Sequence, residues 1–442
     1  MVKLKLCKRF SGNFFFKAGG FALMSAITLF SCNDESMIAE NNETNDYLLD
    51  EYAFFDPSDT LNITACEAED IATAFMDEIG GVDNTFKSKG MRFSCRKTTV
   101  IPDDNREPAL YAINLDPDGF CIVAATKKTE TILAYSDQGK FDLNNLPDGL
   151  AEWLVEKIEI IQETREEASI STIKPNIPPK DGGFLPVAGK EADDQYIIDT
   201  YGPLLKTEWG QEYPFNIMCP DKGCYIVDKC CKAGCVAIAA AQVIRYWEPS
   251  VSYNTHTYSW GKMPNTIYPT KSDNYIRHNI GYLSMANLIH DVGVAVGMDY
   301  DCEQSGAKSE RIPDVLKQIF EFSDDCICEE LTNSKAEPKL INNILRKQPV
   351  IMAGHRTKKL LGLVYQNGHA WVCDGYKKVT HKYKNEVVET NKYYHMNWGW
   401  GGTDNGWFTL DLKLYESDHK DKADKGYIYK RKYITNIHPK AN

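Results

Sequence analysis

The stretch that most constrains this chain is an apolar helix near its middle, KAGCVAIAAAQVIRYW, which runs from Lys232 to Trp247. It is too apolar to be a surface helix. Its first turn carries Cys235 directly behind Gly234. The positive end of a helix dipole lowers the pKa of a thiol, and a glycine leaves open space beside it for a substrate carbonyl. The competing interpretation is that Cys235 is a small apolar residue that fills the core.

A thiol nucleophile needs a base, and the stretch NGHAWVCDGY supplies a candidate. His369 follows Gly368 and opens a strand-like apolar run, so we expect its ring to project from the end of a sheet. A third element follows in HMNWGWGGTDNGWF. There the amide oxygen of Asn397 can accept the imidazole N–H, and the indole of Trp398 can exclude water from the pair. Taken singly, a histidine or a glycine-rich aromatic turn is more often structural.

A fourth element lies upstream in LLKTEWGQEYPFN, where the amide of Gln211 can donate, with the backbone N–H of Cys235, to the oxyanion of a tetrahedral intermediate. These stretches, together with GVAVGMDYDCEQSGA, resemble in the same order the streptopain family of papain-like cysteine peptidases. The resemblance covers nearly all of residues 196–412. Residues 66–164 resemble the more variable propeptide domain of that family.

The resemblance implies a papain-like α+β fold, with a helical part and an antiparallel sheet, preceded by a small α+β prodomain. It also implies a zymogen whose own prodomain is an intramolecular inhibitor until the linker is cut, and it implies no cofactor. The site residues that it implies are Cys235 as nucleophile, His369 as base, Gln211 as oxyanion donor, Asn397 and Trp398 as orienting and shielding residues, and Ser305 and Gly368 as residues whose backbone holds the substrate.

The rest of the chain indicates an exported, multi-part protein. A charged start and the short apolar run AGGFALMSAITLFS predict a signal peptide over residues 1–31. LFSC resembles a bacterial lipobox, which predicts lipid attachment at Cys32. The lipid would anchor the protein at the cell envelope, in the outer membrane or at the surface, and processing could then release the protein. The alternative is a plain secretory signal. We expect a polar tether (32–60), a propeptide-like domain (61–168), a Pro- and Gly-rich linker with the activation cleavage (169–195) and a peptidase domain (196–442).

Four cysteines stand just ahead of Cys235 in CPDKGCYIVDKCCKAGC, and they depart from the family's usual pattern. One interpretation is a metal site with Cys235 as a ligand. Metal-binding knuckles usually contain C-x2-C pairs, and this stretch has none, so one or two disulfides that brace the loop explain it more simply. The four residues are Cys219, Cys224, Cys230 and Cys231.

The sequence therefore predicts a surface-attached cysteine endopeptidase, made as a zymogen, that acts on protein or peptide substrates. The net charge of −12 and the pI of about 5.4 argue against nucleic acid as its main partner. Two alternatives stay open. One is a catalytically idle adhesion or ligand-binding lipoprotein on the same fold. The other is an acyltransferase, for which an aspartate would be expected in place of Asn397.

Overall fold

The structure is a computed structural model of the 442-residue chain. The expected lipidation site Cys32, the tether and nearly all of the linker lie outside the residues that it describes, as does the expected signal peptide apart from its last strand-forming pair. The described residues are 29–30, 61–86, 88, 90–170, 194–224, 229–267, 271–354, 358–360, 363–365, 368–411 and 431–440.

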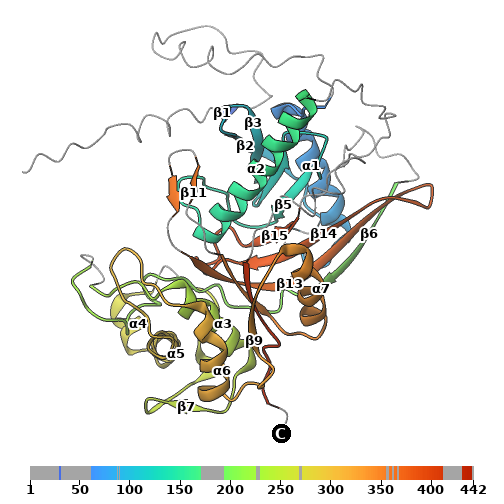
Figure 1. Ribbon diagram of the computed structural model, residues 1–442. Helices are drawn as coiled ribbons and strands as arrows, with labels where there is room; N and C mark the ends of the chain where they lie inside the picture. Colours follow the sequence, from blue (N-terminus) through green and yellow to red (C-terminus); the bar gives the residue numbers. More distant parts are fainter. Residues whose placement is uncertain are drawn as a thin grey trace, which may run out of the picture.

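The N-terminal part is a four-stranded antiparallel sheet between two helices (Figure 1). Helix α1 (Ala65–Val82) begins with a capping box, in which Thr64 and Glu67 bond each other's backbone N–H groups and so satisfy two amides that a helix start leaves unpaired. The other elements are β2 (Ser94–Pro102), β3 (Pro108–Asp116), β4 (Phe120–Ala124), β5 (Ile132–Ser136) and α2 (Asp148–Ile170). A two-residue strand, β1 (Leu29–Phe30), pairs with β2.

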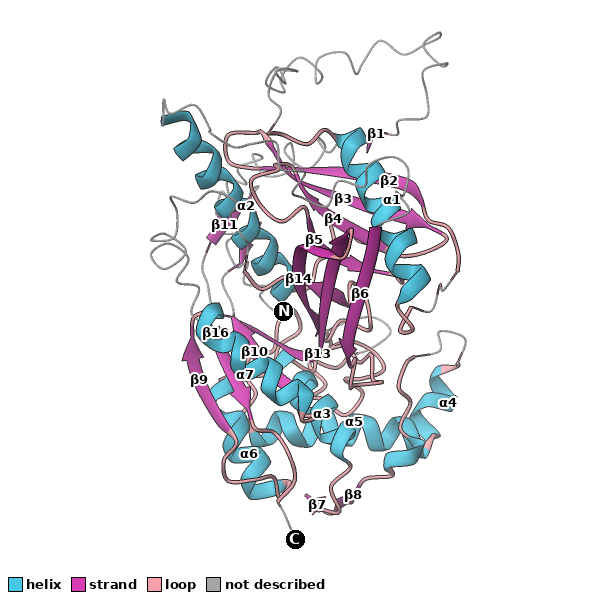
Figure 2. Cartoon of the chain, turned by 90° about the vertical axis from the view of Figure 1, so that its right-hand side faces the viewer, coloured by secondary structure: helices cyan, strands magenta, loops and turns pink. Residues whose placement is uncertain are grey.

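The C-terminal part contains a helical half that packs around α3 (Figures 1 and 2). This half contains α3 (Cys235–Trp247), β7 (Ser252–Tyr253), β8 (His256–Thr257), η2 (Trp260–Lys262), α4 (Asp273–His278), α5 (Ile280–Ala295), η3 (Ser309–Arg311) and α6 (Ile312–Ile319). The helix that the sequence singled out is buried along most of its length, because α5 and the sheet cover it. The apolar composition of α3 is thus the composition of a central core helix.

The remaining strands form the second half of the C-terminal part, with helix α7 (Asn333–Leu345). They are antiparallel, as the resemblance implied, and the mixed helical and antiparallel fold is confirmed. Strand β6 joins the sheet by pairing with β13. The strands are β6 (Asp194–Tyr201), β9 (Ile327–Leu331), β10 (Val350–Gly354), β11 (Lys358–Leu360), β12 (Leu363–Tyr365), β13 (His369–Tyr383), β14 (Glu386–Asn397), β15 (Gly406–Phe408) and β16 (Arg431–Thr435).

One sheet runs through both parts of the chain, which the sequence did not predict. Its order is β1-β2-β3-β4-β5-β15-β14-β13-β10-β16-β9. The two parts meet where β5 pairs with β15, through Trp407 opposite Tyr135 and Phe408 opposite Ala134. Each strand covers the edge that the other would leave open. The N-terminal part is therefore held against the C-terminal part by backbone pairing as well as by side-chain packing.

Strand β13 separates two hydrophobic cores by the alternation of its side chains. Ala370 and Val372 belong to the core around α3, whereas Trp371 and Cys373 belong to the core that α2 and α7 cover. Successive residues of a strand point to opposite faces, so His369 lies on the same face as Trp371. Consequently α2, from the N-terminal part, lies on the face of the sheet that carries His369.

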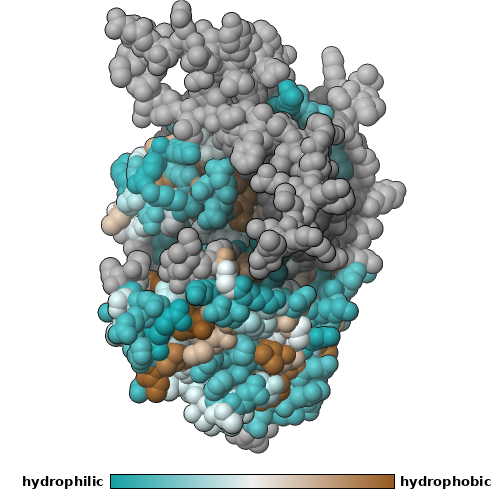
Figure 3. Space-filling view, turned by 90° about the vertical axis from the view of Figure 1, so that its left-hand side faces the viewer, coloured by the Kyte–Doolittle hydropathy of each residue, from teal (hydrophilic) through white to brown (hydrophobic). Residues whose placement is uncertain are grey.

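The surface view in Figure 3 shows hydrophobic residues in separate patches among hydrophilic ones. No helix in the described part of the chain has the length and apolar character that a membrane crossing requires. The apolar side chains instead gather in three internal clusters, around α1, around α2 with α7, and around α3.

Candidate active site

The start of α3 is built so that Cys235 sits at the helix terminus, against a glycine. Gly234 is the N-cap with a φ of 85°, which favours glycine. A Cβ at this position would lie 2.6 Å from the sulfur of Met298 and 3.1 Å from the carbonyl oxygen of Ser305. No larger residue fits without movement of this loop. Cys235 is itself buried, with 6% of its surface exposed.

His369 is the first residue of β13, as expected, and is buried beside Cys235. Its Nε2 lies 3.0 Å from the backbone carbonyl oxygen of Trp398. A carbonyl only accepts hydrogen bonds, so Nε2 carries the hydrogen and Nδ1 is the nitrogen available to the thiol. The ring is also stacked near Trp371, at 6.2 Å between centroids, and Trp400 lies 6.4 Å away at its edge. This aromatic surround keeps the pair away from bulk water.

Cys235 and His369 shift each other's pKa toward an ion pair. Burial raises the pKa of the Cys235 thiol, but the charge and hydrogen bond of His369 outweigh burial and lower it below its ordinary value. Burial likewise lowers the pKa of His369, but Cys235 first, and then Asp148 and the Trp398 carbonyl, raise it to about 9. A thiolate facing an imidazolium is the reactive form of a thiol nucleophile. These shifts fit the expected roles of Cys235 as nucleophile and His369 as base.

Gln211 is brought to the start of α3 by the backbone. The N–H of Ala233 donates to the Gln211 carbonyl at 2.9 Å, and Gln211 is buried. Its neighbour Trp209 is fixed on both sides, by Gln242 of α3 and by the N–H of Gly401. The expected oxyanion donor thus lies on a loop that is tied to the nucleophile's helix and to the glycine turn after Trp398.

Ser305 and Gly368, the two expected substrate-holding residues, have different environments. The Ser305 hydroxyl donates to the Lys232 carbonyl at 2.6 Å and accepts from the Asp301 N–H at 2.9 Å, so it supports the loop that leads into α3. Its backbone lies against Gly234. Gly368 is exposed and directly precedes His369. Both positions border the site, and their contact with substrate stays a prediction.

Asn397 differs from its expected role. Its Nδ2 donates to the Thr207 carbonyl at 2.7 Å, and its Oδ1 accepts from Gln242 Nε2 and from the Gly399 N–H, both at 3.2 Å. The imidazole N–H goes to the carbonyl of the next residue, Trp398. Asn397 therefore orients His369 indirectly, by fixing the turn that carries this carbonyl.

Trp398 lies at the site, and its role in shielding the site stays a prediction. Its indole is buried, donates from Nε1 to the Asp404 carbonyl at 3.0 Å, and packs on Trp371 with centroids 5.4 Å apart. Gln242, which holds both Asn397 and the Trp209 N–H, was missed by the sequence analysis. The available signal was a single amide side chain inside the fully apolar run of α3, since a buried amide needs partners.

The sequence analysis also missed the residues of the N-terminal part that cover the site. Asp148 opens α2, and its Oδ2 lies 3.9 Å from His369 Nδ1. At the next residue, Gly149, a Cβ would lie 2.9 Å from the Trp398 ring and 3.0 Å from the rings of His369 and Trp371. The first turn of α2 therefore sits directly on the histidine. These two residues stand in the LPDGL segment, which the sequence shows as a helix start. No local pattern reveals that this helix start contacts the site.

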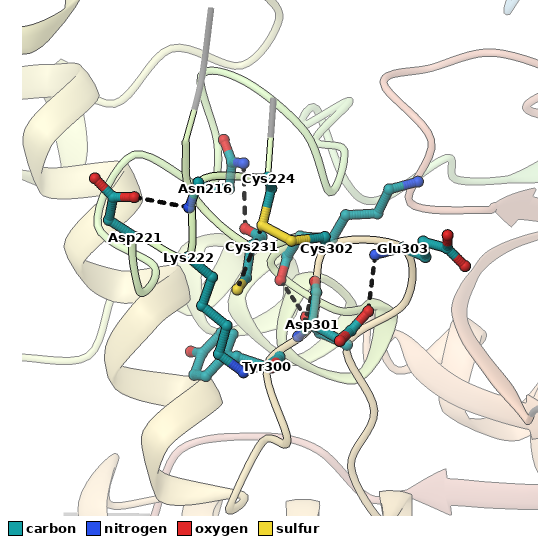
Figure 4. The surroundings of a disulfide bond; sticks show 12 residues. Asn216, Asp221, Lys222, Cys224, Cys231, Tyr300, Asp301, Cys302 and Glu303 are labelled. Atoms are coloured by element: carbon teal, nitrogen blue, oxygen red, sulfur yellow. Dashed lines mark hydrogen bonds between the residues drawn. A yellow bond between two sulfur atoms is a disulfide. The ribbon is translucent and has the colours of Figure 1, made fainter. Parts of the chain in front are cut away.

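The cysteine cluster contributes one residue to a disulfide whose partner the sequence did not identify. Cys224 bonds Cys302, which lies 78 residues away, on the loop that also carries Ser305 (Figure 4). The Sγ of Cys231 lies 3.8 Å from that of Cys224. Cys224 therefore forms one of the one or two disulfides expected to brace this loop, with a partner outside the four-cysteine stretch. Among the described residues, the sulfur atoms that gather closely are those of Cys224, Cys231 and Cys302, of which two are joined in the disulfide, and Cys235 is not one of them.

Comparison with known proteins assigns the site to a family. A family model described as Peptidase C10 family matches residues 209–408, which span all the expected catalytic positions. This part of the chain is therefore similar to the Peptidase C10 family. A second family model, Spi protease inhibitor, matches residues 61–161, the N-terminal part that carries α1 and most of α2. The resemblance to the streptopain family, with a propeptide domain, is thereby confirmed.

Individual relatives agree with this assignment. The chain is 27% identical over 381 residues to the thiol protease/hemagglutinin PrtT of Porphyromonas gingivalis, covering 79% of this chain and 39% of the relative. It is 25% identical over 341 residues to streptopain of Streptococcus pyogenes, covering 68% of this chain and 74% of streptopain. A solved fragment of prointerpain A from Prevotella intermedia has the same fold, with a TM-score of 0.50 and 20% identity over 75% of this chain and 96% of the fragment.

Proposed function

We propose that the chain is the precursor of an exported cysteine endopeptidase, in which Cys235 and His369 hydrolyse peptide bonds. The Cys235 thiolate attacks the carbonyl carbon, and the resulting oxyanion accepts hydrogen bonds from the Gln211 amide and the Cys235 N–H. His369 Nδ1 then gives its proton to the leaving amine as the C–N bond breaks. Water, deprotonated by His369, attacks the thioester and releases the acid and the thiolate.

The observation that carries this proposal is that Cys235, at the start of α3, is buried beside His369, whose Nε2 is held by the Trp398 carbonyl so that Nδ1 is left for the thiol. The pKa of Cys235 is lowered and that of His369 is raised, each by the other, although burial acts against both. A catalytically idle protein that kept the fold for adhesion or ligand binding has no need to maintain two such charges in a buried site. The neutral Asn397, where an acyltransferase was expected to have aspartate, favours hydrolysis over acyl transfer.

The N-terminal part is the inhibitor in this proposal. The first turn of α2 lies on the rings of His369, Trp371 and Trp398, so a peptide cannot reach the histidine while α2 is in place. Cleavage in the linker 169–195 would let this part leave. We further propose lipid attachment at Cys32, supported by the lipobox-like LFSC, which holds the precursor at the bacterial cell envelope. Cys32→Ala should shift the protein from the membrane to the soluble fraction, and continued membrane association would contradict the anchor.

The decisive experiment follows maturation of the full-length chain by mass spectrometry under reducing conditions. Wild type should convert to a shorter form, whereas Cys235→Ala should stay intact alone and be cut in the linker when processed wild type is added. Cys328→Ala is a matched control, because this half-buried thiol lies on β9, in a different part of the fold. Maturation and casein cleavage by Cys235→Ala at the wild-type rate would refute the proposed nucleophile.

A further inference from the structure

One row of residues crosses three strands beside the catalytic histidine. Gly354 at the end of β10 pairs with His369 of β13, and Ala353 pairs with Lys432 of β16, so Arg431 is next in line. The side chains of this row face α2. The Trp371 ring lies between the two ends, 6.2 Å from the His369 ring and 5.8 Å from the Arg431 guanidinium carbon.

The propeptide helix α2 presents a carboxylate to each part of this row. Asp148, Glu152 and Glu156 recur every four residues, so they lie along one face of the helix. Asp148 reaches His369, whereas the other two reach the far end of the row. Glu156 Oε2 lies 2.6 Å from Arg431 Nη2, and Glu152 Oε1 lies 3.5 Å from Arg431 Nε. The Glu152 carboxylate also occupies the space that a Cβ on Gly354 would need.

The peptidase part supplies a second donor for the same carboxylate. Asn333 Nδ2 donates to Glu156 Oε1 at 3.2 Å. The orientation of the Asn333 amide is fixed by a second hydrogen bond, in which Asn333 Oδ1 accepts from the Tyr433 hydroxyl at 2.7 Å. All the carboxylates that ion-pair with Arg431 among the described residues come from α2, while Asp411 interacts with Asn333. When α2 leaves, Arg431 and Asn333 keep their positions on β16 and α7 but lose their anion.

The row lies on the side of the site that receives the leaving-group part of the substrate, which is the segment after the scissile bond. His369 gives its proton to the departing amine, so the segment after the scissile bond extends from Cys235 past His369. Adjacent strands are about 4.8 Å apart, which puts the Arg431 backbone roughly 10 Å from that of His369. An extended peptide advances about 3.3 Å per residue, so roughly three residues cover this distance.

We propose that in the processed enzyme Arg431 and Asn333 bind a carboxylate of the substrate, within about three residues after the scissile bond. The propeptide then inhibits by placing Glu152 and Glu156 where this substrate group binds. An arginine fork beside an amide donor suits a carboxylate, from an acidic side chain or from the end of a short peptide. The inference rests on the proposed peptidase function, since it concerns the substrate of the same site.

The test uses enzyme processed from the full-length chain and an internally quenched peptide that it cuts at one bond. One series carries Glu or Gln at the first, second or third position after that bond, with an amidated end. A second pair ends at the third position as the free acid or the amide. We expect about tenfold higher kcat/KM for the carboxylate member in one of these arms, which also identifies its source. Equal rates in every pair would overturn the inference and leave the peptidase function intact, whereas no cleavage of any peptide would overturn both.

Variants assign the preference to Arg431. Arg431→Gln should bring the Glu-to-Gln ratio, or the acid-to-amide ratio, to about one, and Arg431→Lys should keep part of it because it keeps the charge without the fork. Arg346→Gln removes an exposed arginine at the end of α7 and should retain the wild-type ratio. A ratio that survives in Arg431→Gln would overturn the assignment. If that precursor does not mature, the wild-type peptide pairs and Arg431→Lys still decide.

Discussion

Gly149 offers the most direct test of how the propeptide blocks the site. A single methyl group at this position would lie 2.9 Å from the Trp398 ring and 3.0 Å from the rings of His369 and Trp371. These rings are buried and packed against each other, so none can retreat freely. In Gly149→Ala the first turn of α2 must move away from His369 instead.

The size of the effect follows from overpacking. An extra methyl group in a close-packed site costs about 1–3 kcal/mol, which corresponds to a roughly 5- to 150-fold larger population of precursor with α2 displaced. Alanine also favours a helix over glycine by about 1 kcal/mol, which acts in the opposite direction. Gly81→Ala is the matched control, because this glycine lies in the last turn of α1 and its added Cβ would meet no other part of the chain within 4 Å.

The assay is the time course of conversion of the full-length precursor on a gel, together with its activity on a small peptide before conversion. We expect Gly149→Ala to convert faster and to show peptide cleavage while still uncut, whereas Gly81→Ala should behave as wild type. Thermal unfolding of both variants checks that neither has simply lost its fold. Equal conversion rates for the two variants would mean that α2 does not rest on the catalytic histidine.

Three further outcomes follow from the site. Asn397→Ala leaves buried partners without hydrogen bonds and should lower the free energy of unfolding by about 1–3 kcal/mol, while kcat falls less than in His369→Ala, because the Trp398 carbonyl still orients the ring. Cys302→Ser should lower the free energy of unfolding by up to about 4 kcal/mol in denaturant without reductant, since its disulfide closes a loop of 78 residues. The His369 pKa is raised to about 9, so stabilisation of the precursor by Asp148 should be complete below about pH 6.5 and be lost as pH rises through 9. The melting temperatures of wild type and Asp148→Asn should then converge across that window, and a constant difference would contradict the contact.

The proposed catalytic pair, Cys235 and His369, was predictable because its signals are local. One signal is a cysteine behind a glycine at the first turn of an apolar helix, and the other is a histidine at the start of an apolar strand. Each signal gives both the type of side chain and the end of the helix or strand at which it lies. The partner of the imidazole was not predictable in the same way. Asn397 and Trp398 are neighbours, and a backbone carbonyl has no signature in the sequence, so the side chain with a known hydrogen-bonding capacity was the natural but incorrect choice.

The long-range contacts were hidden for a different reason. Cysteine spacing does not determine connectivity, so nothing near Cys224 pointed to Cys302. Likewise, the pairing of β5 with β15 is made by backbone hydrogen bonds. Every residue except proline offers both a backbone donor and a backbone acceptor, so no residue type marks this pairing in the sequence. Two features of α2 are visible in the sequence, namely the glycine at position 149 and the regularly spaced acidic residues. Neither can be interpreted without knowing which residues lie opposite it in the fold.

The interface between propeptide and peptidase combines strong apolar packing with charges that suit a temporary contact. Lys377 of β13 is buried beside Asp83 at the end of α1, at 2.5 Å, and burial lowers its pKa to about 8 even with this partner. Arg431 is buried beside Glu156 in the same manner.

Two buried ions recover much of their interaction energy as hydration when they separate, whereas two apolar surfaces recover none. Both cations belong to the peptidase and both carboxylates to the propeptide, so separation leaves a peptidase surface that water can solvate. Backbone pairing at the junction involves two residue pairs of the short strand β15. The closed precursor is therefore held by many contacts at once, but once the linker is cut its halves can part without exposing only apolar surface.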